Sequence, residues 1–159
     1  MKNPDFCYNR SYSFKTNPYH ANLLQDLYMG SCGEVVSFLQ FTYQSNQLIP
    51  FGKPQGKIFK ELACDDNFHL TELAELIILL GGNIEYCHAK KFLSGSIISY
   101  SKDIKSMLHQ NIEMKEKSII AYKIAVAKIE NINIKNKLIA ISKTEEHHLF
   151  LLKNELAKI

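Results

Sequence analysis

The sequence has little of what marks several protein classes. Its 159 residues include no tryptophan, seven glycines, four prolines and four cysteines. The cysteines, Cys7, Cys32, Cys64 and Cys87, lie far apart. Because no C-x-x-C pair occurs, the sequence does not predict a zinc ribbon or a rubredoxin-type knuckle. We therefore expect free thiols in a reducing compartment.

A long apolar segment and a strong net charge are also missing. The longest apolar run extends only from Leu76 to Leu80, whereas a membrane span needs roughly 20 residues. Residues 1–20 lack the apolar core of a signal peptide. The net charge is +3 with scattered lysines, which favours neither nucleic acid nor a membrane surface as a partner. We expect a cytoplasmic protein with one domain.

Apolar residues recur at helical spacing in four segments. These segments are residues 21–45, 57–80, 101–130 and the segment from about 134 to the C-terminus. The first and third connections are short, which is typical of antiparallel neighbours, and the middle one is long enough to cross the length of a bundle. The sequence predicts an all-α fold: an irregular arm over residues 1–20, then a four-helix bundle over 21–159. Its two antiparallel hairpins are joined by a long crossover.

Polar residues interrupt each apolar stripe near its middle. They are Glu34 in the first, Asp66 and His69 in the second, Lys115 in the third, and Glu145 and His148 in the fourth. A buried charge without a partner costs free energy, so four interruptions at one level predict a single shared site. The spacings D-x-x-H and E-x-x-H place a carboxylate and an imidazole on one helix face, where both can bind one metal ion.

This pattern approaches that of bundles that bind iron or manganese pairs, in which two helices supply a Glu and two supply Glu-x-x-His. Two positions depart from it. Asp66 is one methylene shorter than the expected Glu, and Lys115 occupies the position of a further Glu. The neighbouring Glu116 could reach in as a replacement. Three carboxylates less one lysine leave two negative charges, which match one divalent cation. Without that cation, we expect at least one carboxylate to take up a proton.

The segments that carry these residues resemble the ferritin-like superfamily, and in particular its rubrerythrin, manganese-catalase-related and spore-coat-type bacterial members. The matching segments are residues 30–34, 61–69, 73–82, 111–122 and 144–148. The resemblance implies iron or manganese, one or two ions per chain. The ligands that it implies are Glu34, Asp66, His69, Glu145 and His148, with Asp66 and Glu145 in the bridging positions. It also implies a homodimer.

Two functions follow from this resemblance. In the first, the protein is an oxidoreductase that acts on peroxide, dioxygen or ferrous iron with a separate electron donor. Tyr122 then either packs over the site or donates a hydrogen bond to a ligand carboxylate. In the second, the protein is a structural or spore-coat-like assembly protein. Its metal-poor core is then held by ion pairs from Lys115 to Glu145, Asp66 or Glu34. The absence of a fifth helix after Ile159 argues against a ferritin cage.

Overall fold

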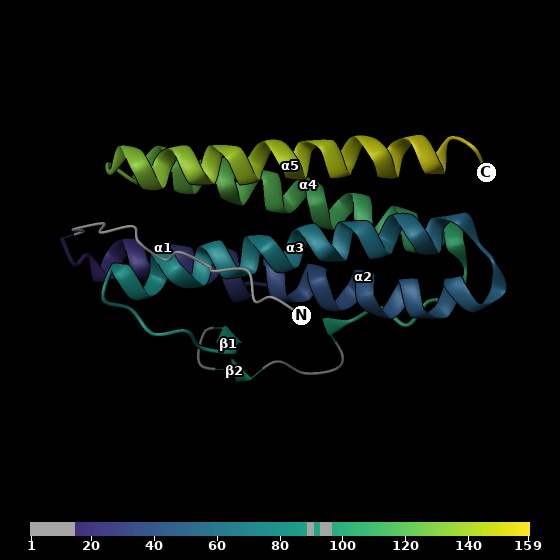
Figure 1. Cartoon of the computed structure of the whole chain (residues 1–159), viewed down its shortest axis with the longest axis horizontal. Helices are drawn as coiled ribbons and strands as arrows, with labels where there is room; N and C mark the ends of the chain where they lie inside the picture. Colours follow the sequence, from purple (N-terminus) through teal and green to yellow (C-terminus); the bar gives the residue numbers. More distant parts are fainter. Residues whose placement is uncertain (1–14, 89–90, 93–96) are drawn as a thin grey trace, which may run out of the picture.

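The computed structural model describes residues 15–88, 91–92 and 97–159, and long helices dominate it (Figure 1). The elements are α1 (Pro18–Met29), α2 (Glu34–Leu48), the 3₁₀ turn η1 (Ile49–Phe51), α3 (Pro54–Leu79), β1 (Cys87–His88), β2 (Lys91–Phe92), α4 (Ile104–Lys128) and α5 (Ile132–Leu156). Helices α2 and α3 form one antiparallel hairpin, and α4 and α5 form a second one above it in Figure 1. The predicted all-α bundle of two hairpins is therefore confirmed.

Local sequence accounts for the helix ends. The Asp103 side chain accepts a hydrogen bond from the Ser106 amide at 2.8 Å and caps α4, and Asn131 caps α5 in the same way. Helix α3 begins at Pro54, whose fixed φ suits a first turn. Beyond its other end, Gly81 has a φ of +81°, a conformation that other residues adopt only with strain. The ends of α3, α4 and α5 agree with the predicted boundaries to within a few residues.

The predicted continuous helix over residues 21–45 is wrong, because the chain turns between α1 and α2. A Cβ atom on Gly33 would lie 2.7 Å from the Gly30 amide nitrogen and 2.9 Å from the Leu27 carbonyl oxygen, so the turn needs glycine there. Ser31 is exposed in this turn. The break makes Glu34 the first residue of α2, where the helix dipole stabilises a carboxylate.

Helix α1 begins inside the predicted N-terminal arm. It starts at Pro18, and the Asn17 side chain accepts a hydrogen bond from the His20 amide at 3.0 Å. His20 and Ala21 are already buried, so the bundle begins earlier than residue 21. Residues 1–14 of the predicted arm lie outside the described residues.

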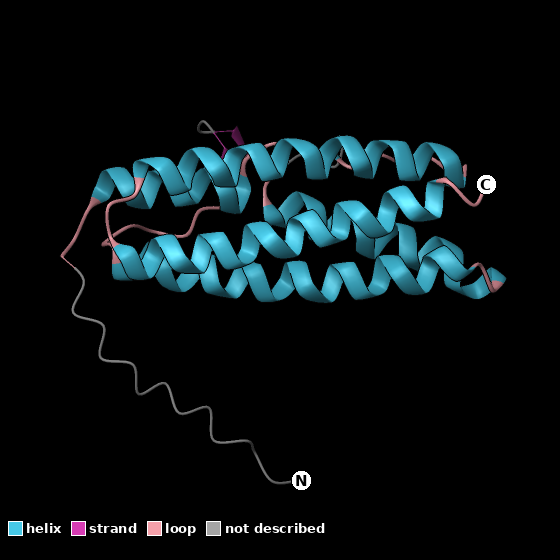
Figure 2. Ribbon diagram, turned by 90° about the horizontal axis from the view of Figure 1, so that it is seen from above, coloured by secondary structure: helices cyan, strands magenta, loops and turns pink. Residues whose placement is uncertain are grey.

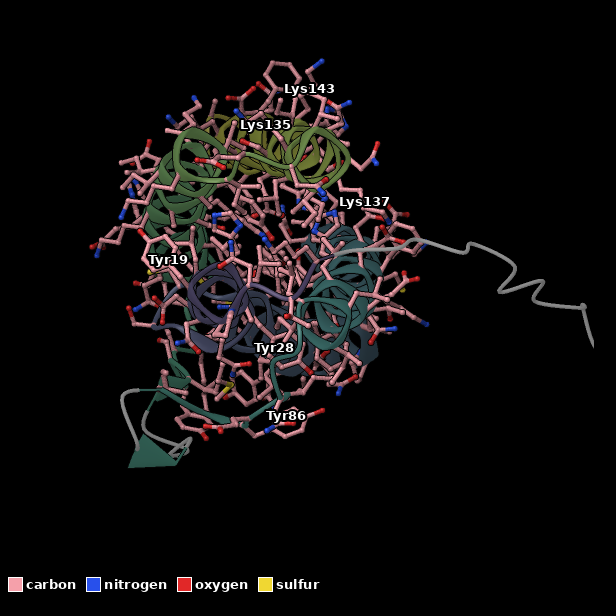
Figure 3. The ribbon with its side chains drawn as sticks, turned by 90° about the vertical axis from the view of Figure 1, so that its left-hand side faces the viewer. Tyr19, Tyr28, Tyr86, Lys135, Lys137 and Lys143 are labelled. Atoms are coloured by element: carbon pink, nitrogen blue, oxygen red, sulfur yellow. The ribbon has the colours of Figure 1, made fainter. Side chains whose placement is uncertain are left out.

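The described parts of the crossover lie beside the bundle, between the end of α3 and the start of α4 (Figures 1 and 2). It includes a short antiparallel pair, β1 with β2, in which Cys87 is opposite Phe92. The sequence contains no period-two segment that predicts this pair. Tyr28 of α1 donates a hydrogen bond to Tyr86 at 3.2 Å and anchors the crossover (Figure 3).

The apolar core is divided into two clusters along the bundle. One cluster contains Leu24, Leu76 and Leu138, and the other contains Phe59 and Leu152. Polar residues of the predicted stripes lie between the two clusters, which therefore enclose them from both ends. Among the described helices, none is long and apolar enough to cross a membrane.

Candidate metal centre

Four ligand-type side chains meet between the two apolar clusters. Glu34 of α2, Asp66 and His69 of α3, and Glu145 of α5 are buried, and each offers one ligand atom within 4.8 Å of the others. Nδ1 of His69 lies 3.5 Å from Oε2 of Glu34 and 3.4 Å from Oε1 of Glu145. Residues that are up to 111 positions apart in the sequence (145 − 34) thus form one cluster, as the stripe pattern predicts.

His148 lies at the edge of this cluster. Its Nδ1 atom is 3.3 Å from Oε1 of Glu145 and 3.7 Å from Oδ1 of Asp66. On its other side, Nε2 lies 3.0 Å from Oδ2 of Asp65. When Nε2–H donates to Asp65, the neutral imidazole keeps its Nδ1 lone pair free for a metal ion. Sequence reasoning missed Asp65, although its place directly before Asp66 was visible.

Lys115 reaches the middle of the centre from α4. Its Nζ atom lies 2.8 Å from Oδ1 of Asp66 and 2.7 Å from Oε2 of Glu145, and all three side chains are fully buried. The ammonium group also lies 5.3 Å from the centre of the Phe41 ring, a favourable cation–π arrangement. Two of the three ion pairs predicted for Lys115 are therefore formed.

Two hydroxyl groups hold the carboxylates in place. The Tyr122 hydroxyl donates to Oε1 of Glu34 at 2.6 Å, and the Ser37 hydroxyl donates to Oδ2 of Asp66 at 2.5 Å. The hydrogen bond predicted as one role of Tyr122 is thus present. Ser37 was not predicted, although it follows Glu34 by three residues and so shares its helix face. Burial raises the pKa of Tyr122 well above its usual value, so the phenol remains a neutral donor.

Solved structures of other proteins are similar to this fold, although the sequence matches no known family. No protein-family model matches the sequence, and no curated protein does. Two structures of KatB, a manganese catalase from Anabaena, superimpose with a TM-score of 0.85, covering 99% of this chain and 80% of that chain at 17% identity. A Rhodobacter capsulatus bacterioferritin superimposes with a TM-score of 0.75, covering 91% of this chain and 87% of that chain at 16% identity. The fold is ferritin-like. The ferritin-like fold that the sequence resemblance implies is therefore confirmed.

Charge in the buried cluster is balanced by protons and by Lys115. Burial raises the pKa of Asp66 to about 7, although Lys115 opposes this effect. Burial would also raise the pKa of Glu145, but Lys115 and the two histidines lower it well below its ordinary value. For His69, burial would lower the pKa, but the carboxylates of Glu145 and Glu34 outweigh burial and raise it to about 10. In the absence of a metal ion, His69 carries the second positive charge.

Three buried ligand atoms have no hydrogen-bond partner within the described part of the chain. They are Oε2 of Glu34, Nδ1 of His69 and Nδ1 of His148. An unpaired buried polar atom costs about 1–3 kcal/mol, and native structures contain few of them. All three atoms are ligands that iron and manganese accept, and they border the same carboxylates. The residues of this centre therefore fit a metal ion.

Glu116, predicted as a replacement ligand, is not part of the cluster. Its carboxylate pairs with Lys153 at 2.7 Å on the surface, where the Glu116 side chain is 48% exposed. Successive residues on an α-helix point about 100° apart, so α4 cannot direct both Lys115 and Glu116 into the core. Helix α4 thus contributes a cation to the centre where a Glu was the expected residue type.

Proposed function

We propose that this chain is a ferritin-like metalloprotein that binds one divalent iron or manganese ion. Glu34, Asp66, His69 and Glu145 would hold the ion, with His148 as a fifth ligand. The observation that carries this proposal is the convergence of unpaired ligand atoms on one buried point. Two similar structures support the choice of metals: KatB is a manganese catalase, and the bacterioferritin structure has heme iron and a dinuclear site that is metal-free.

Lys115 takes the place of a second metal ion in this proposal. A lysine ammonium is a compact cation with three donors, and Nζ contacts both Asp66 and Glu145. These are the two residues that the family resemblance assigns to the bridging positions. Three carboxylates, one lysine and one divalent ion sum to zero charge, whereas a second divalent ion would leave a buried excess of positive charge.

Redox chemistry toward peroxide, dioxygen or ferrous iron is the activity that we infer for the loaded centre. Bound iron or manganese would supply Lewis acidity and one-electron redox steps. The chain itself supplies a water-poor site between two apolar clusters. Tyr122 donates the hydrogen bond that fixes Glu34 and is the candidate catalytic residue beside the centre. A homodimer, a cytoplasmic location and a separate electron donor remain part of this proposal.

A structural role is the second candidate, and the Lys115 ion pairs favour it. They satisfy Asp66 and Glu145 without any metal ion. A protein with such a core would act in assembly, as spore-coat-type ferritin-like proteins are expected to do. The two candidates differ in metal content, which can be measured directly.

The deciding experiment is elemental analysis of the protein after expression with iron and manganese supplied. We expect about one metal ion per chain, the number that the charge balance above requires. No metal would favour the structural role, and about two would contradict the assignment of Lys115 to the second site. The variant Lys115→Glu should raise the content toward two ions. Lys117→Glu, on the same helix but exposed, is the matched control and should leave it unchanged.

Activity is tested on the loaded protein. We expect peroxide consumption or ferrous-iron oxidation to exceed that of a variant with both Glu34→Ala and Glu145→Ala. Equal rates in the two proteins, at full metal content of the wild type, would remove the redox activity from the proposal while keeping the metal site.

A further inference from the structure

The two histidines of the centre differ in what lies beyond their rings. The outer nitrogen of His148 is 3.0 Å from Asp65. His69 instead lines a groove of about 240 Å³ between α3 and α5. The difference has a basis in the sequence, because Asp65 precedes Asp66 in one motif and Thr144 precedes Glu145 in the other. Thr144 lines the groove beside His69 and cannot act as an anionic partner.

His69 connects this groove to the buried carboxylates. It is only 4% exposed and forms part of the groove wall. Its Nδ1 atom lies 3.5 Å from Glu34 and 3.4 Å from Glu145. Neither of these carboxylates lines the groove. Two further pockets formed by described residues, one beside Tyr28 and one beside Gln110, contain no member of the four-residue cluster. The His69 ring therefore separates the cluster from a surface opening by the thickness of one side chain.

Acidic side chains lie at the mouth of the groove. Asp65 is 57% exposed, and Glu72, which is 21% exposed, pairs with Lys137 across the gap between α3 and α5. Figure 3 shows Lys137 at the side of the molecule where α5 faces α3. Carboxylates at the mouth of a cleft raise the local concentration of cations.

We propose that this groove is the entry site for the divalent cation, and that His69 is the ligand that receives the ion and passes it to the carboxylates. This inference rests on the proposed function, since it concerns the same centre. The competing route starts at a pocket of about 210 Å³ that α4 lines with Gln110 and Asn111. That pocket reaches the level of the centre but contains no ligand of the cluster.

Metal uptake kinetics test the route with Mn²⁺ as the probe. Metal-free full-length protein is mixed with Mn²⁺ in a stopped-flow instrument with a fluorescent chelator as competitor, and affinity and stoichiometry are measured separately at equilibrium. The variant Ala140→Phe places a large side chain at an exposed position of the groove and should block it. We expect the loss of the fast uptake phase with unchanged affinity, because a blocked path slows association and dissociation alike. Gln110→Phe, an exposed residue of the competing pocket, should take up Mn²⁺ as the wild type does.

A second variant tests the groove without filling it. Glu72→Gln removes one carboxylate from the mouth and should lower the association rate about tenfold at low salt, with the difference fading as salt screens the charge. The route is overturned if Ala140→Phe loads at the wild-type rate, or if Gln110→Phe loses the fast phase. If Mn²⁺ fails to bind at equilibrium, the metal site itself fails and the route with it. Binding with unaltered kinetics in Ala140→Phe rejects the route alone.

Discussion

The two helical hairpins contribute unequal halves to one centre. The ligand-type groups of the α2–α3 hairpin are two carboxylates and an imidazole, with Glu34 at the position that corresponds to Lys115 in the α4–α5 hairpin. Oε2 of Glu34 accepts no hydrogen bond and has only His69 at 3.5 Å beside it, whereas the Lys115 ammonium donates to two carboxylates. One half of the centre is therefore satisfied by the protein, and the other half is left for a cation. In the function that we propose, Lys115 in place of a glutamate would therefore leave room for one metal ion instead of two.

A second difference lies outside the ligands. His148 is held by Asp65, while His69 has a groove beside it. The two carboxylate-x-x-His motifs therefore differ in their surroundings: the His148 ring is fixed by a hydrogen bond, and the His69 ring lies in the wall of a groove. The following predictions test these two asymmetries, in order of the expected effect.

Replacement of Lys115 should have the largest effect on stability. Lys115→Ala leaves Asp66 and Glu145 buried without their cation, so the metal-free protein should lose about 3–5 kcal/mol of unfolding free energy. Urea unfolding in the presence of a chelator measures it. Lys115→Met keeps most of the side-chain volume and separates loss of charge from loss of packing. Lys117→Ala on the exposed face should change little, and a neutral result for both Lys115 variants would contradict the role of the ion pairs.

The metal-free protein should become less stable as the pH rises. Asp66 has its folded pKa raised from 3.8 to about 7, so its stabilising effect is complete below pH 3.8 and is lost as the pH rises through 7. For His69 the folded pKa is raised from 6.5 to about 10, so its effect is complete below pH 6.5 and is lost as the pH rises through 10. Between pH 7 and 9, one proton should give a slope of about 1.4 kcal/mol per pH unit.

Denaturant unfolding in chelator at several pH values measures this slope. The variant His69→Gln should remove most of this slope between pH 7 and 9, because glutamine cannot hold the proton that His69 holds in this range. Metal affinity should show the opposite dependence and rise with pH, since the ligands bind after losing their protons. Unfolding free energy that is constant or increasing over this range would contradict the assigned protonation of His69.

The hydrogen bond from Tyr122 should have a smaller effect. Tyr122→Phe retains the buried ring and removes only the hydroxyl that donates to Glu34. A hydrogen bond to a charged group contributes about 1.5–3 kcal/mol, and we expect a loss of that size in the metal-free protein by urea unfolding. Tyr19→Phe, at a tyrosine that is 60% exposed, is the control. Equal stability of Tyr122→Phe and the wild type would show that this hydrogen bond does not hold Glu34.

The smallest effect should come from the residues that precede each motif. Asp65→Ala should weaken metal affinity about 10–100-fold, the usual consequence of removing the outer partner of a histidine ligand. Thr144→Ala, at the corresponding position in α5, should leave affinity unchanged, because Thr144 makes no hydrogen bond to His69 within the described residues. Isothermal titration with Mn²⁺ compares the two, and equal effects would remove the asymmetry between the histidines.

The helices, the hairpins and most of the centre follow from the sequence. Apolar spacing and helix caps act over one or two turns, so they can be recognised without knowledge of the rest of the chain. The same spacing placed Glu34, Asp66, His69, Glu145 and His148 on inward faces, where the structure has them. It also indicated that Lys115, and not a glutamate, would face them.

Tertiary structure alone decided which groups meet across helices. The pairs Ser37 with Asp66 and Asp65 with His148 are 29 and 83 residues apart, and they depend on how far one helix is shifted along another. The turn at Gly33 depends on close backbone approach that a continuing apolar pattern conceals, and Glu116 pairs at the surface because Lys115 occupies the inward direction. Helical period determines which face a residue lies on, but the axial register and rotation of packed helices come from the fit of whole surfaces.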